Sequence, residues 1–398
     1  MRIVPEAEPS ARPASQLRTV SPSAATGCHR AWVEVSCSAI AANVRQLRGV
    51  LAPQTELVAV VKADAYGHGA VRVARTALAA GASRLAVATL QEGKELRQAG
   101  IDAPILLLGA ANDPGEIAAI ADWQLQPTLG MPQQALTVSE VMAQRGGTIT
   151  VHLKIDTGMS RLGTLWERAA EFVRLVRQLP HLKIASLYSH LATADDPDPT
   201  VMQWQQQRFS AAIASLQAHG IALPPLHLAN SAATLRDRSC HYDWVRVGLA
   251  LYGLHPAPHL RSCLALQPAL QLKAKVTQVK TIPAGAGVSY GHQFVADRPM
   301  PIAVVGIGYA DGVPRNLSNR LQVLARGRRL SQIGAITMDQ LMLDASAIPD
   351  LSPGEVVTLI GQDGEAAIEA TSWAEALGTI DWEILCGFKH RLPRIERD

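Results

Sequence analysis

Eight short runs rich in valine, isoleucine and leucine alternate with longer helix-type stretches over residues 31–266, and this alternation limits the possible folds most strongly. The runs lie near residues 57–61, 85–89, 105–108, 124–128, 149–155, 183–189, 226–228 and 244–247. Residues 70–80 and 201–219 show the clearest helical periodicity. Eight strand–helix units in roughly 240 residues predict an α/β fold, a (β/α)8 TIM barrel, over residues 31–267. Alternation alone leaves a doubly wound sheet open as the alternative.

The pattern changes after about residue 268. Leu270, Leu272, Ala274 and Val276 alternate with polar residues, as in a strand with one buried face. Similar runs follow near 302–307, 321–324, 332–336, 341–343 and 356–360, and only 371–377 has a helical pattern. We therefore expect residues 268–398 to form a mostly antiparallel β-domain, which makes two domains in a chain of 398 residues.

The first 30 residues differ from the rest of the chain. They carry four prolines among serine, alanine and scattered charges, without an apolar period. This composition is typical of a disordered extension, which we expect over residues 1–30. The apolar centre of a secretory signal is missing. Arginine and serine also suit a transit peptide, although Glu6 and Glu8 argue against that alternative.

Composition and charge exclude several classes of function. Lys and Arg exceed Asp and Glu by 37 − 34 = 3, and no basic stripe is present, so no nucleic-acid partner is expected. The apolar stretches fall far short of the roughly 18 residues that a membrane span needs. The five cysteines are odd in number and lack C-x-x-C spacing, which favours reduced thiols in a cytoplasmic protein.

Motifs for nucleotides and metals are absent from the sequence. The glycines at 306, 308 and 312 are spaced one position too widely for the dinucleotide fingerprint. Asp195, Asp196 and Asp198 are interrupted by prolines, which indicates a solvated turn rather than a metal cluster. We therefore expect no metal site.

A lysine directly after an apolar strand is the most informative single feature. Lys62 follows the run at 57–61 and opens the segment Lys-Ala-Asp-Ala-Tyr-Gly-His-Gly. Lysine is rarely buried without a reason. At the carboxyl end of a barrel strand it would lie at the catalytic mouth, where a desolvated amine can form a Schiff base. Judged from this position alone, the alternative is a lysine without a catalytic role whose amine extends from the strand end into solvent.

Polar residues also follow four other predicted strands. Lys154 lies in the fifth run, His190 follows the sixth, Ser231 follows the seventh, and Arg246 lies in the eighth with Gly248 after it. Barrel active sites form at these strand ends, and phosphate is commonly bound after strands seven and eight. A hydroxyl and free backbone N–H groups suit a phosphate dianion. The five ends together therefore predict an active site with a phosphate-binding corner.

These segments resemble the alanine racemase family, whose members are pyridoxal 5'-phosphate enzymes with a barrel and a β-domain. The resemblance covers residues 31–394 and rests on nine segments in the family's order: 59–69, 153–163, 186–196, 227–235, 244–254, 287–291, 306–314, 338–340 and 391–394. It implies an isomerase that interconverts L- and D-alanine and supplies D-alanine for peptidoglycan. It also implies a head-to-tail homodimer in which the β-domain supplies residues to the partner's site.

The resemblance implies a two-base mechanism on a planar pyridoxal-phosphate aldimine. Lys62 holds the cofactor covalently and serves the proton of the D-enantiomer, and Tyr290 of the partner subunit serves that of the L-enantiomer. His190 hydrogen-bonds that tyrosine and connects it to Arg246. Arg246 faces the pyridine nitrogen and discourages a proton there, because arginine is effectively always protonated. The weaker electron sink suits racemisation over transamination.

Binding roles are implied in the same way. The cofactor phosphate is held by Tyr66, Ser231, Gly248 and the backbone of Leu249. Arg161 touches the substrate carboxylate and the cofactor phenolate oxygen, and the matching position to Lys154 is carbamylated in some members. The N–H of Met338, from the partner, meets the substrate carboxylate. An access corridor for a small zwitterion is implied at three further positions: Tyr309, Arg315 and Asp195.

Three positions depart from many relatives. His390 stands where a tyrosine contributes to cofactor phosphate binding and to the inner gate, so a racemase of serine or of broader range is an alternative. Thr337 stands where some relatives have cysteine and Trp382 where many have tyrosine, and we expect both to adjust packing more than mechanism. Two further alternatives are a decarboxylase of the same architecture, against which Arg246 argues, and a non-catalytic cofactor-binding barrel, against which the β-domain argues.

Overall fold

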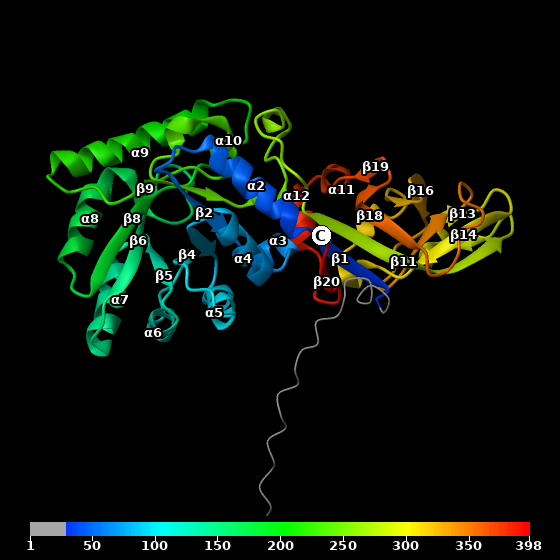
Figure 1. The fold of residues 1–398 in the computed structure, drawn as a ribbon, viewed down its shortest axis with the longest axis horizontal. Coiled ribbons are helices and arrows are strands. Elements are labelled where there is room, and N and C mark those ends of the chain that lie inside the picture. Colours follow the sequence, from blue (N-terminus) through cyan, green and yellow to red (C-terminus); the bar gives the residue numbers. More distant parts are fainter. Residues whose placement is uncertain (1–28) are drawn as a thin grey trace, which may run out of the picture.

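The computed structural model describes residues 29–398, which form a barrel and a β-domain lying side by side (Figure 1). The extension expected over residues 1–30 lies outside the described residues as far as residue 28. Arg30 lies inside them, and its guanidinium donates to the fully buried carboxylate of Asp311 at 2.7 Å. The chain is therefore anchored to the β-domain from residue 30 onward.

Eight parallel strands form the barrel: β2 (Glu56–Val60), β3 (Arg84–Val87), β4 (Ile105–Ala110), β5 (Gln126–Leu129), β6 (Ile149–Asp156), β8 (Leu182–Tyr188), β9 (Leu226–His227) and β10 (Trp244–Val247). Each pairs with the next along the chain, and β10 pairs with β2. The ring is closed, which confirms the TIM barrel and rules out a doubly wound sheet, since that would have two open edges. A two-residue strand, β7 (Thr164–Leu165), pairs with β6 outside the ring.

Helices surround the barrel (Figure 1): α2 (Cys37–Val50), α3 (Lys62–Gly67), α4 (Ala70–Ala80), α5 (Leu90–Gln98), α6 (Pro114–Asp122), α7 (Pro132–Arg145), α8 (Ala169–Gln178), α9 (Thr200–Ala218) and α10 (Ser231–Arg236). Side chains at the first turns explain where several begin. Thr89 and Glu92 form a reciprocal capping box at α5, and Asp113 accepts the N–H of Glu116 at α6. The helices expected at 70–80 and 201–219 are confirmed as α4 and α9. Among residues 29–398, every helix is too short or too polar to cross a bilayer.

The β-domain is built on a second closed ring, which confirms the mostly antiparallel architecture expected. Its strands, in order around the ring, are β11 (Leu270–Ile282), β14 (Met300–Val305), β17 (Leu341–Asp344), β16 (Arg328–Ile333), β15 (Gln322–Ala325) and β18 (Val356–Asp363). All pair antiparallel, and β18 returns to β11. Smaller elements are attached to this ring: β12 (Gly287–Val288), β13 (Phe294–Val295), β19 (Ala366–Ile368), α11 (Ala370–Leu377) and α12 (Asp381–Cys386).

The two ends of the described chain meet in the β-domain. β1 (Ala31–Val35), which lies within the range assigned above to the barrel, pairs antiparallel with β11 and parallel with β20 (Arg394–Glu396). In Figure 1 it is the blue strand beside the yellow-green β11. α12 returns in the other direction and packs against α3 of the barrel. The chain therefore crosses between the two domains more than once, which joins them firmly.

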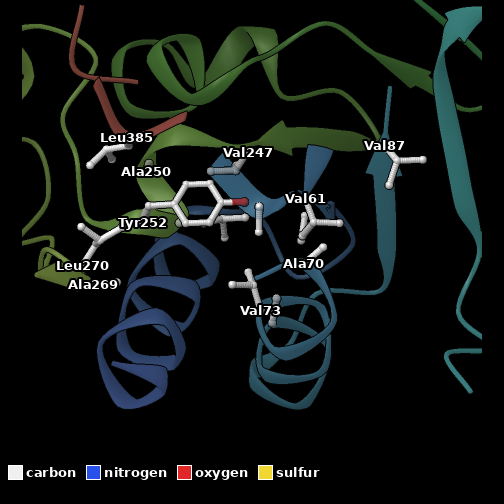
Figure 2. Close-up of a cluster of buried hydrophobic side chains, with 14 of the residues drawn as sticks. Val61, Ala70, Val73, Val87, Val247, Ala250, Tyr252, Ala269, Leu270 and Leu385 are labelled. Carbon is white, nitrogen blue, oxygen red and sulfur yellow. The ribbon is translucent and has the colours of Figure 1, made fainter. Parts of the chain in front are cut away.

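A buried cluster supports the strand end that carries Lys62. Figure 2 shows Val61, immediately before the lysine, packed near Tyr252, with Leu270 and Leu385 approaching from the β-domain side. Tyr252 is 1% exposed, and its hydroxyl donates to the carbonyl of Val60 at 2.8 Å. The end of β2 is thus fixed by both apolar packing and a buried hydrogen bond.

Candidate active site

A cavity of about 630 Å³ opens at the carboxyl ends of the barrel strands. This volume suits a cofactor together with a small substrate. Ten of the predicted site residues line it: Lys62, Tyr66, Lys154, Arg161, His190, Asp195, Ser231, Arg246, Gly248 and Leu249. They come from β2, β6, β8, β9 and β10 or from the segments that follow these strands. The five polar strand ends expected to meet at the mouth are therefore brought together.

Lys62 is followed by a left-handed turn. The four residues 63–66, none of them glycine, all have φ between 52° and 54°. Each costs about 1 kcal/mol or more in this region. Neighbouring elements hold the turn in place: Glu92 of α5 accepts the N–H of Ala63 at 2.8 Å, and Arg394 of β20 donates to the carbonyl of Gly67 at 3.1 Å. The strain is therefore maintained directly after Lys62, where this lysine enters the cavity.

One corner of the cavity, lined by Tyr66, Ser231 and Gly248, has the groups that a phosphate needs. The N–H of Gly248 donates to Oγ of Ser231 at 3.1 Å, and the Tyr66 hydroxyl comes so close that a Cβ on Gly248 would lie 2.7 Å from it. Burial raises the pKa of Tyr66 to about 12, so its hydroxyl stays a donor. The first N–H groups of the 3-10 turn Leu249–Tyr252 have no partner within the turn. Two hydroxyls and backbone N–H groups thus converge there.

Arg246 is held rigidly in the floor of the cavity. Its side chain is 4% exposed, and Nη2 donates to the carbonyls of Ser189 at 2.7 Å and Leu228 at 3.1 Å. The same nitrogen lies 3.2 Å from Nδ1 of His190. Burial and the Arg246 charge lower the pKa of His190 well below its usual value, so the imidazole is neutral at physiological pH.

Positive charge dominates the cavity lining. Four basic side chains, from Lys62, Lys154, Arg161 and Arg246, face it together with the carboxylate of Asp195. Such a lining suits a ligand with several anionic groups. Pyridoxal 5'-phosphate bears a phosphate and a phenolate oxygen, and an amino acid adds a carboxylate. The amine of Lys62, the phosphate corner and this charge therefore fit the cofactor that the resemblance implies.

Lys154 lies on β6 and is 4% exposed. Burial, and then the charge of Arg161, lower its pKa from 10.5 to about 8. A neutral amine is the form that reacts with carbon dioxide. The environment of Lys154 thus favours the chemistry that carbamylation requires.

Replacing Lys154 with methionine is expected to stabilise the protein at pH 7 by about 2 kcal/mol in buffer free of carbon dioxide. The folded pKa, about 8, lies below the ordinary 10.5, so the folded chain bears a penalty that is complete below pH 8 and fades as the pH rises to 10.5. The gain in the variant should fade over the same range. Urea unfolding of both proteins at pH 7 and pH 10 measures the difference in their free energies of unfolding. The same difference at both pH values would contradict the argument that burial lowers the pKa of Lys154. Added bicarbonate should stabilise only the wild type.

Five predicted site residues do not line the cavity of the single chain: Tyr290, Tyr309, Arg315, Met338 and His390. All belong to the β-domain and are exposed. Hydrogen bonds tie together the segments that carry Tyr290, Tyr309 and Met338. The N–H of Ala310 donates to the carbonyl of Met338, and Oγ of Ser289 donates to the carbonyl of Ala335. Exposure reaches 72% for Tyr290 and 53% for Met338, which is high for such side chains.

The two lining residues that come from the β-domain were missed as site residues by the sequence reasoning. Trp382 and Cys386 belong to α12 of the β-domain, yet both face the cavity. α12 reaches the barrel because Gly67 of α3 lacks a Cβ, which would lie 2.5 Å from the carbonyl of Leu385. Nothing in the sequence marks Cys386 as a site residue, because a cysteine without a second cysteine at a motif spacing is interpreted as an ordinary reduced thiol. Among residues 29–398 the four cysteines are free.

Comparisons with known proteins agree with this geometry. The family model for the alanine racemase N-terminal domain matches residues 35–256, and that for the C-terminal domain matches residues 269–396. Alanine racemases of Nostoc and Synechocystis species are 64% and 65% identical over 92% of the chain, covering 95% and 98% of their own lengths. A crystal structure of alanine racemase from Bacillus anthracis with bound L-Ala-P has a TM-score of 0.87 at 38% identity, covering 93% of this chain and 95% of that one.

The agreement extends over both domains in their order along the chain. The family models together span nearly all of residues 35–396, and their two ranges coincide with the barrel and the β-domain of this structure. The lysine, the phosphate corner and the buried arginine occupy the barrel mouth, where active sites of such barrels form. This protein is a member of the alanine racemase family.

Proposed function

We propose that this protein interconverts L-alanine and D-alanine, and that its D-alanine is used in peptidoglycan synthesis. The observation that carries the proposal is the amine of Lys62 in a cavity with a phosphate corner and a donor-only arginine. The family depends on pyridoxal 5'-phosphate, which is therefore the cofactor. Tyr66, Ser231, Gly248 and the backbone of Leu249 would hold its phosphate.

The cofactor, when bound through Lys62, supplies an electron sink that stabilises negative charge on the α-carbon of the amino acid. Inversion at that carbon needs a base on each face of the substrate. Nζ of Lys62 exchanges the α-proton on the face of the D-enantiomer. Oη of Tyr290 of the partner subunit exchanges it on the other face. Arg161 binds the substrate carboxylate, together with the N–H of Met338 of the partner subunit.

Arg246 and His190 adjust the two proton transfers. A guanidinium only donates hydrogen bonds, so Arg246 presents a donor to the pyridine nitrogen and disfavours a second proton there. The neutral imidazole of His190 accepts from Arg246 at Nδ1, which leaves its proton on Nε2 to face the tyrosine. A free tyrosine titrates near pH 10, so a hydrogen bond to its oxyanion helps it to act as a base near neutrality.

A head-to-tail homodimer completes the site in this proposal. Tyr290, Met338 and Tyr309 are 72%, 53% and 40% exposed, and hydrogen bonds tie their segments into one face of the β-domain. An exposed group of large apolar side chains is typical of an interaction surface. Because the single chain supplies only one of the two bases to its own cavity, the second must come from a partner. Arg315 and Asp195 would then flank the access corridor with Tyr309.

A racemase of broader range remains the second candidate, and His390 is the observation that favours it. His390 is exposed and does not line the cavity of the single chain, in contrast to Trp382 and Cys386 nearby. A smaller or differently charged side chain at an inner gate would admit substrates with a hydroxyl, such as serine. The gate of the proposed dimer therefore decides the substrate range.

Purified protein loaded with pyridoxal 5'-phosphate and incubated with a mixture of L-amino acids should yield D-alanine as the dominant D-enantiomer on chiral chromatography. Comparable D-serine would move the assignment to the broader racemase and leave the mechanism unchanged. A folded, cofactor-loaded dimer that forms no D-product would contradict the proposed function. The His390→Tyr variant, assayed in parallel, shows whether this position sets the ratio of the two products.

A further inference from the structure

A chain of hydrogen bonds crosses the barrel interior from Arg246 to Gln126. Nη1 of Arg246 lies 2.8 Å from Nδ1 of His227, and Nε2 of His227 lies 2.7 Å from Oγ of Ser186. The same Oγ lies 2.7 Å from Nδ1 of His152, whose Nε2 lies 3.0 Å from Oε1 of Gln126. The five residues come from neighbouring strands, β10, β9, β8, β6 and β5. Gln126 opens β5, so the chain runs from the cavity toward the opposite end of the barrel.

The donors and acceptors of this chain can be arranged in only one way when both imidazoles are neutral. A guanidinium only donates, so Nδ1 of His227 accepts and its ring proton is on Nε2. Ser186 accepts that proton in a hydrogen bond. Its O–H donates to Nδ1 of His152, because the amide oxygen of Gln126 needs the His152 proton on Nε2. The proton of His152 is then on Nε2 and donates to Gln126. The amide oxygen of Gln126 faces His152, so the chain ends on the acceptor that it requires.

Both imidazoles are neutral in this environment. His227 and His152 are 0% and 1% exposed. Burial and the Arg246 charge lower the pKa of His227 well below its usual value, and burial lowers the pKa of His152 to about 3. The ring of Tyr188 stacks on His227 at 4.6 Å between centroids and lies 5.0 Å from the guanidinium carbon of Arg246. These contacts fix the ring plane of His227, so only its proton position remains to be set.

We propose that Ser186 is a positioning residue that fixes the protons of His227 and His152, and that it thereby holds Arg246 in place for the reaction. Its hydroxyl is the one link that can accept from His227 and donate to His152 at the same time. Without it, the proton of His227 can move to Nδ1, where it would face the N–H groups of Arg246. The guanidinium would then lose an acceptor and shift. The inference rests on the proposed function, because it acts through the role given there to Arg246.

His190 is fixed by the same arrangement. Nη2 of Arg246 donates to Nδ1 of His190 at 3.2 Å, so the position of the guanidinium sets which nitrogen of His190 keeps its proton. A shift of Arg246 therefore disturbs both the donor toward the cofactor ring and the donor toward the catalytic tyrosine. Ser186, which is fully buried beneath them, is in this way coupled to both bases of the reaction without touching the substrate.

The first test is made on the wild-type protein and needs no activity. Nitrogen-15 NMR of the histidine-labelled chain, with and without pyridoxal phosphate, reports which ring nitrogen carries each proton. His227→Gln and His152→Gln assign the two signals by their loss. We expect both residues to be neutral with the proton on Nε2. A proton on Nδ1 of either ring, or a charged ring, would overturn the proposal.

The second test removes the link. Ser186→Ala is expected to give a mixture of tautomers at His227 and to lower kcat for racemisation roughly tenfold, about 1.4 kcal/mol, with a smaller change in KM. Ser186→Thr, which keeps a hydroxyl, should restore the single tautomer and most of kcat. Ser139→Ala is the matched control, because Ser139 is also a buried barrel-domain serine, 5% exposed, whose hydroxyl donates to the carbonyl of Pro180.

The outcomes separate this inference from the proposed function. If the wild type does not racemise alanine but has the expected tautomers, the proposed function fails and the role of Ser186 in setting the protons stands. If the wild type racemises alanine and Ser186→Ala has the same tautomers and the same kcat, the role of Ser186 fails and the proposed function stands.

Discussion

Replacing Lys62 with alanine is expected to remove the covalent link between the protein and pyridoxal 5'-phosphate and to lower racemisation by roughly 10³-fold or more. Lys62 is the amine that a buried strand and a strained left-handed turn hold at the cavity. The phosphate corner of Tyr66, Ser231 and Gly248 is untouched, so the variant should still bind the cofactor without a covalent bond.

Borohydride reduction followed by peptide mass spectrometry measures the link directly. In the wild type the added mass should lie on the peptide that contains Lys62. Lys183→Ala is the matched control, because Lys183 is an exposed lysine of barrel strand β8 and should leave the link and the activity unchanged. A reduced adduct on Lys154 in the wild type would contradict the assignment, since that lysine also faces the cavity.

The barrel could be predicted because its signals are local. Each strand is a short apolar run, and the polar residue that follows it, such as Lys62 or His190, reaches the mouth by the geometry of the fold. The closed ring of the β-domain was harder to predict from the sequence. The pairing of β1 with a strand of the β-domain could not be predicted at all. Ala31 pairs with Ala274, and nothing in a run of five residues indicates a partner so distant along the chain.

The interior chain of hydrogen bonds also escaped the sequence reasoning. His152, Ser186 and His227 each lie inside an apolar run, where a single polar residue reads as an isolated exception. They meet only because alternate residues of neighbouring strands point into the barrel at the same level. The left-handed turn after Lys62 was equally hidden, since alanine and tyrosine rarely adopt positive φ and the strain is balanced by Glu92 and Arg394, which are distant in sequence.

Conservative replacement of the proposed second base separates the two directions of the reaction. Tyr290→Phe keeps the ring and removes the hydroxyl, so loss of the α-proton from L-alanine should fall by roughly 10²- to 10⁴-fold. Exchange of the α-proton of D-alanine with deuterated water should fall less, because Lys62 serves that face. Proton NMR of each enantiomer in deuterated water, with the cofactor-loaded variant, measures both rates. Equal rates to wild type in both directions would remove Tyr290 from the mechanism.

Mixing two inactive variants tests whether the site is shared between subunits. If Tyr290 reaches only the partner's cavity, a dimer of one Lys62→Ala chain and one Tyr290→Phe chain has one site with both residues intact and one with neither. Random exchange of subunits should then restore about a quarter of wild-type activity, since half of the dimers are mixed and each has one working site.

A chain with both substitutions is the control, because mixing it with Lys62→Ala rebuilds no intact site. Absence of recovery in the first mixture would place both bases on one chain and contradict the exposure of Tyr290 as the mark of a partner's site. Recovery in the control would instead show that activity does not need Lys62.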